Sequence, residues 1–304
     1  MSGLVTYKTP GIETIHETED KLSRCQILFI LFLPLVFVFG GLTSIITTRL
    51  LGPAITTNPI LSTLVGFVIG ILVFVIFIPK VLRMPNGKTS IRDYLGTIGV
   101  TRIQPISRTL VIFLPCLAFI LISQIVSSLI YNQLVLRWDF NDFTSHLFDP
   151  VRISDTIGLS PIIAVGSVFE EIVLRGVVLT MLLKVYSRRQ AVFGSAVAFG
   201  YVHIVNLLNG PPTYELITFV FAQITWTTII GVLYGYMFLI TGNLYANMFL
   251  HWFANGASNC FMYLPYVTPD VYNLLNIVFN IGLMATSMSL LWIFLIKKIW
   301  PLRR

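Results

Sequence analysis

The sequence has few charged residues and only three cysteines. Asp, Glu, Lys and Arg make up 11% of its 304 residues, whereas a soluble domain carries roughly a quarter. This excludes a water-soluble globular enzyme. The cysteines are scattered, and the 21 glycines and 15 prolines follow no period, which excludes a disulfide-rich secreted module and a collagen. The remaining composition, with 56% hydrophobic residues, is that of a polytopic membrane protein.

Long apolar stretches predict the fold class. A helix needs about 20 predominantly apolar residues to cross the hydrocarbon core of a bilayer. Eight stretches meet this condition: 26–46, 60–82, 109–131, 158–183, 191–208, 215–240, 244–264 and 273–296. We therefore expect an all-α polytopic membrane protein with eight transmembrane helices. The polar residues 1–25 lack the features of a signal peptide, so we expect a cytoplasmic N-terminal head followed by one transmembrane domain over 26–304.

The basic residues indicate how the chain is oriented. The formal net charge is +7, and 16 of the 20 Lys and Arg residues fall in the head, in the C-terminal tail and in every second loop between the predicted spans. By the positive-inside rule this pattern places both termini in the cytoplasm. We expect a multi-pass integral membrane protein, in the cell membrane if the source is prokaryotic, with the lipid bilayer as a partner and no nucleic acid.

Five ionisable residues lie inside the predicted spans, away from the span ends: Glu170, Glu171, Arg175, His203 and His251. Such groups are costly in a membrane and usually mark a functional site. Glu171 and Arg175 are four residues apart with the acid first, the favourable order for a helical ion pair. We therefore expect this pair to support the site, and Glu170, which lacks that partner, to be available for proton transfer.

The positions of the two histidines extend this candidate site. A short basic loop at 185–189 predicts that the fourth and fifth spans form an antiparallel hairpin. Glu170 and His203 lie 17 and 16 residues from the middle of that loop, and therefore at the same depth. A Glu and a His so placed can hold a water molecule for general-base catalysis. His251 and Asn255, four residues apart, are hydrogen-bond donors suited to an oxyanion hole.

These residues form three motifs that resemble a known family, the CAAX protease and bacteriocin-processing (CPBP, or ABI) intramembrane proteases, which include the CAAX prenyl endopeptidases. The family shows E-E-x-x-x-R, F-x-x-x-H and H-x-x-x-N/D, within a core that corresponds here to about 155–265. The matching residues are Glu170, Glu171 and Arg175, then Phe199 and His203, then His251 and Asn255.

The resemblance implies an intramembrane endopeptidase that hydrolyses a peptide bond of a membrane-associated protein or peptide, prenylated in the CAAX branch. It also implies that Glu170 and His203 activate water and that His251 and Asn255 form the oxyanion hole. Glu171, Arg175 and Phe199 would support these four catalytic residues.

Three alternatives stay open at this point. A zinc enzyme would use Glu170, His203 and His251 as ligands with water in the fourth position. We favour metal-free chemistry without a cofactor, because a ligand role for Glu170 removes the best general base. A non-catalytic membrane protein, such as a bacteriocin self-immunity factor, would bind a peptide through the same cavity. A transporter built on Glu170 and His203 is the least favoured, since the chain shows no repeat of its halves.

Overall fold

The computed structural model describes residues 64–65, 68–70, 72–73, 90–101, 109–110, 113–118, 121–122, 125–126, 150–209 and 211–256. Within these ranges every regular element is a helix and no strand occurs, as the sequence predicts. The head at 1–25 and the spans predicted at 26–46 and 273–296 lie outside the described residues. The eight-span topology and the cytoplasmic termini therefore stay predictions.

A long run of consecutive helical segments carries the adjacent residues Glu170 and Glu171. It consists of α10 (Pro150–Glu171), the π-helix η3 (Ile172–Leu179) and the single turn α11 (Thr180–Leu182). All residues of η3 are buried. The change from α-helix to π-helix follows directly after Glu171, and π-helical turns are rare and concentrate at functional sites.

A tight turn reverses the chain into α12 (Arg188–Val202). The Ser187 hydroxyl accepts from the Gln190 backbone N–H, and the Gln190 side chain accepts from the Ser187 N–H. This reciprocal capping box begins the helix. Farther along α12, the Ser195 hydroxyl donates to the Leu174 carbonyl of η3 at 2.8 Å. The predicted antiparallel hairpin is therefore confirmed.

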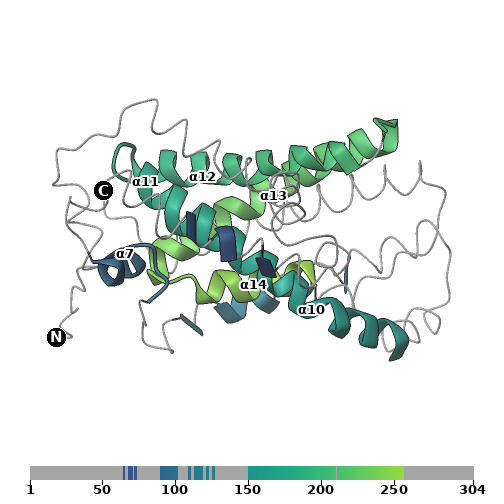
Figure 1. The fold of residues 1–304 in the computed structure, drawn as a ribbon, viewed down its shortest axis with the longest axis horizontal. Coiled ribbons are helices and arrows are strands. Elements are labelled where there is room, and N and C mark those ends of the chain that lie inside the picture. The colour runs from purple at the N-terminus through teal and green to yellow at the C-terminus, as the bar shows by residue number, and fades with distance from the viewer. Residues whose placement is uncertain are drawn as a thin grey trace.

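Three further segments complete the described core. The chain continues from α12 into the 3₁₀ helix η4 (His203–Asn209), and then forms α13 (Tyr214–Thr241) and α14 (Tyr245–Asn255). Helix α13 lies along α12, and α14 packs against α10 (Figure 1). Gly242, in the left-handed conformation with φ of 66°, ends α13 and lets the chain turn back into α14.

Two glycines of α13 allow its close contact with α12. A Cβ atom on Gly231 would lie 3.0 Å from Cα of Ala196, and one on Gly235 would lie 2.9 Å from Cγ1 of Val192. Both distances are too short for ordinary packing. The two helices therefore touch through these glycines, as small residues spaced by four positions commonly allow in membrane proteins.

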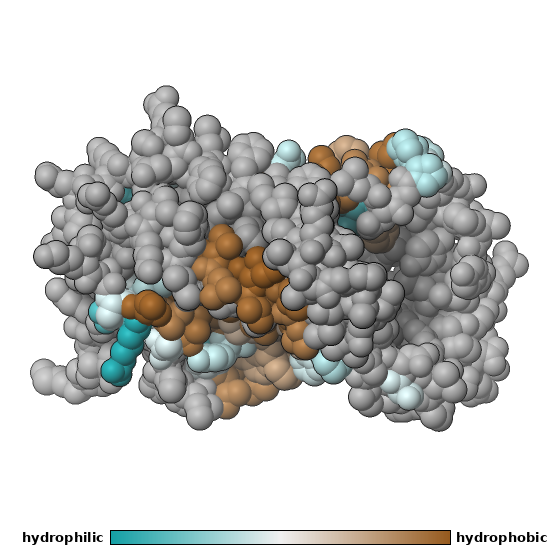
Figure 2. Space-filling model, in the orientation of Figure 1, coloured by the Kyte–Doolittle hydropathy of each residue, from teal (hydrophilic) through white to brown (hydrophobic). Residues whose placement is uncertain are grey.

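The outer faces of α12 and α13 are apolar. Among the described residues, Arg188–Leu207 and Leu216–Thr241 are long and apolar enough to cross a membrane. Phe193, Val197 and Tyr201, spaced by four residues on α12, are all exposed. Figure 2 shows further hydrophobic surface over the middle of the molecule, in the region where Figure 1 labels α14. Large apolar side chains in an outward-facing row are suited to contact with lipid.

A short helix from between the spans predicted at 60–82 and 109–131 docks on this core. Helix α7 (Ile91–Thr97) is capped by the Ser90 hydroxyl, and Tyr94 is buried. Just after α7, the carbonyl oxygen of Ile98 would lie 3.1 Å from a Cβ atom on Gly176. This segment therefore packs directly on η3, next to Arg175.

Candidate active site

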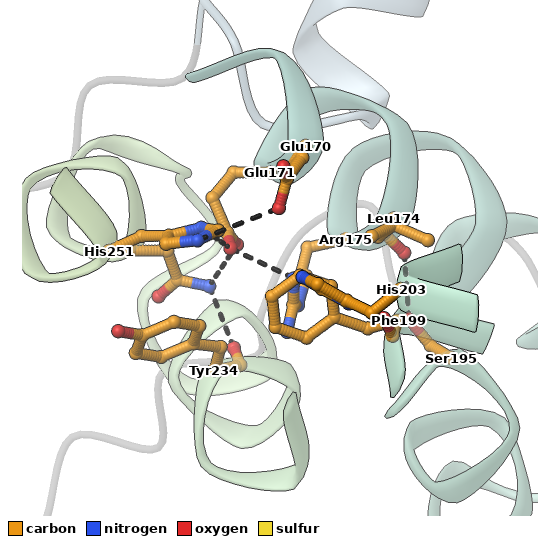
Figure 3. Close-up of polar contacts among 10 residues, drawn as sticks. Glu170, Glu171, Leu174, Arg175, Ser195, Phe199, His203, Tyr234 and His251 are labelled. Carbon is orange, nitrogen blue, oxygen red and sulfur yellow. Dashed lines mark hydrogen bonds and ion pairs between the residues drawn. The ribbon is translucent and has the colours of Figure 1, made fainter. Parts of the chain in front are cut away.

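Three buried polar side chains of the core, Arg175, Asn247 and His251, meet at Glu171, the last residue of α10 (Figure 3). Its side chain is fully buried. Oε1 accepts hydrogen bonds from Nη1 of Arg175 and from Nδ1 of His251, both at 2.9 Å. Oε2 accepts from Nδ2 of Asn247 at 3.3 Å. The predicted ion pair between Glu171 and Arg175 is therefore present, and two donors from α14 complete it.

The Arg175 side chain is held by aromatic rings as well as by Glu171. It is fully buried, and its Cζ lies 4.1 Å from the centre of the Phe199 ring and 5.3 Å from that of Tyr234. Its Nε and Nη2 atoms have no hydrogen-bond partner among the described residues. The negative faces of the two rings therefore compensate part of the cost of burying the guanidinium.

Glu170 lies beside this cluster but is more open. Its side chain is 28% exposed, whereas that of Glu171 is completely buried. One carboxylate oxygen of Glu170, Oε2, is buried and lies 3.6 Å from Nε2 of His251. His251 therefore sits between the two glutamates, with one ring nitrogen toward each.

This arrangement fixes the position of one proton on His251. A carboxylate only accepts, so Nδ1 of His251 must carry the proton that it donates to Glu171. The other ring nitrogen, Nε2, lies 3.6 Å from Oε2 of Glu170, which is longer than a hydrogen bond. Glu171 therefore orients the ring of His251, and Nε2 of that ring faces the more open carboxylate of Glu170.

His203 begins η4, and its ring packs against Phe199. A backbone carbonyl only accepts, so Nδ1 of His203 donates to the Phe199 carbonyl at 2.9 Å, and this bond does not use Nε2. The ring centres of His203 and His251 lie 5.3 and 5.4 Å from that of Phe199. Among the described polar contacts, none joins Glu170 to His203, so a water molecule held between them stays a prediction.

The segment that carries this cluster matches the model of a known family. Residues 153–257 match the description type II CAAX prenyl endopeptidase Rce1-like. The match covers 105 of the 304 residues, and we call this matched segment the Rce1-like domain. The match confirms the resemblance to the CAAX proteases. These proteases are a peptidase family of membrane proteins. Neither the curated proteins nor the solved structures give a match to the chain.

The structure of the Rce1-like domain shows contacts that the sequence motifs did not include. Asn247 is buried and contacts Glu171 directly, and Tyr234 lies beside both Arg175 and His251. Asn247 lies four residues, or one helical turn, before His251. This spacing in the sequence could have predicted that Asn247 lies near the site. Asn255, one turn after His251, is the last residue of α14 and is exposed; its catalytic role stays a prediction.

The zinc alternative requires at least three side chains grouped around one metal ion. Within the residues that the structure describes, no group of three or more His, Cys, Asp or Glu side chains is arranged to hold a metal ion. Glu170, His203 and His251 all lie within these residues. The zinc alternative stays a prediction, and removal of metal ions by a chelator tests it.

Proposed function

We propose that this protein is an intramembrane endopeptidase that works without a metal and uses Glu170 as its general base. One observation carries this assignment. Of two adjacent glutamates, Glu171 is fully buried and held by three donors, whereas Glu170 is partly exposed and lies 3.6 Å from Nε2 of His251. Glu170 is therefore the carboxylate that can both reach a water molecule and exchange a proton with it.

The proposed reaction is hydrolysis of a peptide bond. Glu170 takes a proton from water while the water oxygen attacks the carbonyl carbon, and Nε2 of His203 accepts the second hydrogen bond of that water. Protonated His251 donates from Nε2 to the developing oxyanion, and Asn255 is the second donor. The C–N bond then breaks, and Glu170 passes its proton to the leaving amine. The products are a carboxylic acid and an amine.

Glu171 keeps His251 in the form that this step needs. A carboxylate that accepts from Nδ1 fixes the orientation of an imidazole and stabilises its protonated form, as the aspartate does in a serine protease triad. Here that carboxylate is itself neutralised by Arg175. The chain from Arg175 through Glu171 to His251 therefore leaves Nε2 pointing at the open side of the cluster, where Glu170 lies (Figure 3).

The substrate that we propose is a membrane-associated protein or peptide with a prenylated C-terminal CAAX sequence. The family of the matched model acts on such substrates. The apolar outer faces of α12 and α13 support a location in the bilayer, where a prenyl chain is also inserted.

Cleavage of a prenylated CAAX peptide by the purified protein in liposomes tests this proposal. Glu170→Gln keeps the size of the side chain and removes the base, so cleavage should fall by about 10²- to 10⁴-fold. Glu215→Gln, at the start of α13, is the matched control and should cleave like the wild type. Undiminished cleavage by folded Glu170→Gln protein would refute the assignment.

Removal of metal ions by a chelator distinguishes a metal-free glutamate peptidase from a zinc-dependent one. A glutamate peptidase should keep its rate after exhaustive treatment with a zinc chelator. A rate that is lost on chelation and restored by added zinc would replace the proposed mechanism with a metal-dependent one.

A further inference from the structure

Asn247 connects three helices at the centre of the Rce1-like domain. It lies on α14 one turn before His251, and its side chain is fully buried. One N–H of its amide donates to Oε2 of Glu171 on α10 at 3.3 Å, and the same nitrogen donates to the Tyr234 carbonyl of α13 at 2.8 Å. Both hydrogens of the amide nitrogen are thus used.

These two partners specify the chemistry of the side chain. A carboxylate and a backbone carbonyl only accept, so the residue between them must provide two donors from one atom. An aspartate would place acceptors against acceptors, and a leucine would provide no donor. An asparagine meets this requirement, and it holds the one oxygen of Glu171 that neither Arg175 nor His251 reaches.

We infer that Asn247 is a positioning residue that fixes the carboxylate of Glu171 and, through it, the ring of His251. Three donors hold the two oxygens of Glu171 in one orientation. His251 donates to Oε1, so a rotation of the carboxylate would move the hydrogen-bond acceptor of its Nδ1. Asn247 prevents that rotation because it is anchored at the same time to the backbone of α13.

The effect on catalysis rests on the proposed function, whereas the effect on His251 does not. If Glu171 turns, Nε2 of His251 no longer faces Glu170 at 3.6 Å. Asn247 does not touch the reacting atoms in this scheme, so its loss should act on the rate constant of the chemical step and not on substrate affinity. A small displacement of a positioned catalytic group can lower the rate about 100-fold.

Asn247→Leu, which has a similar volume and no donor, is the test variant. The first readout is the ¹⁵N NMR spectrum of histidine-labelled protein in micelles, with the His251 signals assigned from a His251→Gln sample. The second readout is kcat and KM for the prenylated peptide. Asn243→Leu is the matched control, because Asn243 is also buried, lies in the link between α13 and α14, and donates to Thr109 at 3.4 Å instead of to Glu171.

We expect the His251 signals to move in Asn247→Leu and to stay in place in Asn243→Leu. We also expect kcat to fall by up to about 100-fold with KM within about twofold of the wild type. Unchanged His251 signals in folded Asn247→Leu, or an equal change in Asn243→Leu, would overturn the inference. If Asn247→Leu does not fold, Asn247→Asp replaces it, because it keeps the shape and removes both donors.

The two proposals fail in different ways. If even the wild type cleaves no peptide while the His251 signals respond to Asn247→Leu, the proposed function is wrong and the positioning role stands. If the wild type cleaves and the His251 signals do not respond, the positioning role is wrong and the peptidase assignment stands.

Discussion

Replacement of Arg175 by methionine should destabilise the protein strongly. The side chain is fully buried, and it supplies the countercharge of the equally buried Glu171 at 2.9 Å. Methionine has a similar length and can pack on the rings of Phe199 and Tyr234, so the change removes mainly the charge and its hydrogen bond. The loss of one partner from a buried ion pair costs about 3–5 kcal/mol, since the other charge is left uncompensated.

The same reasoning predicts that the pair is coupled. Glu171→Gln alone leaves the guanidinium buried without a countercharge and should also cost about 3–5 kcal/mol. The double variant Arg175→Met with Glu171→Gln leaves no unpaired charge, so it should lose clearly less stability than the sum of the two single variants. Arg188→Met, at the exposed start of α12, is the control and should change stability little.

Equilibrium unfolding in mixed micelles, followed by circular dichroism during titration with a denaturing detergent, measures these free energies. A single Arg175→Met variant within about 1 kcal/mol of the wild type would refute the view that Glu171 depends on this countercharge. Strict additivity of the two single variants would refute the coupling.

Two further predictions use matched pairs in the same helices. Phe199→Ala should cost about 3–5 kcal/mol, because the ring is 1% exposed and packs on Arg175, whereas Phe193→Ala, at a position 62% exposed, should stay within about 0.5 kcal/mol. Equal losses in the same unfolding titration would contradict the buried and exposed faces assigned to α12. A Cβ atom on Gly200 would lie 2.6 Å from the Ile224 carbonyl oxygen and would also meet the Thr228 hydroxyl. Gly200→Ala should therefore cost about 1–3 kcal/mol or more. Gly166→Ala meets nothing within 4 Å and should stabilise α10 by about 0.4–1 kcal/mol; the midpoints of thermal unfolding compare these two variants.

Local patterns in the sequence predicted the features that depend on neighbouring residues. The low charge and long apolar stretches predicted helices suited to a membrane, and two such helices are found among the described residues. The spacing of Glu171 and Arg175 predicted their ion pair, because residues four apart share one face of a helix. The short basic loop predicted the hairpin of η3 with α12 for a similar reason, since a short connection leaves adjacent helices antiparallel.

The arrangement of the site was decided only by tertiary packing. His251 lies 80 residues from Glu171 in the chain, and the sequence contains no local signal that places its ring between the two glutamates. The sequence pattern predicted ordinary α-helices in this region. It did not predict the π-helix after Glu171 or the 3₁₀ helix that begins at His203. Composition and spacing thus determined which side chains are costly to bury. Only the packing of α10, α12, α13 and α14 decided which of them compensate one another, because that choice depends on contacts between helices and not on the order of residues within one.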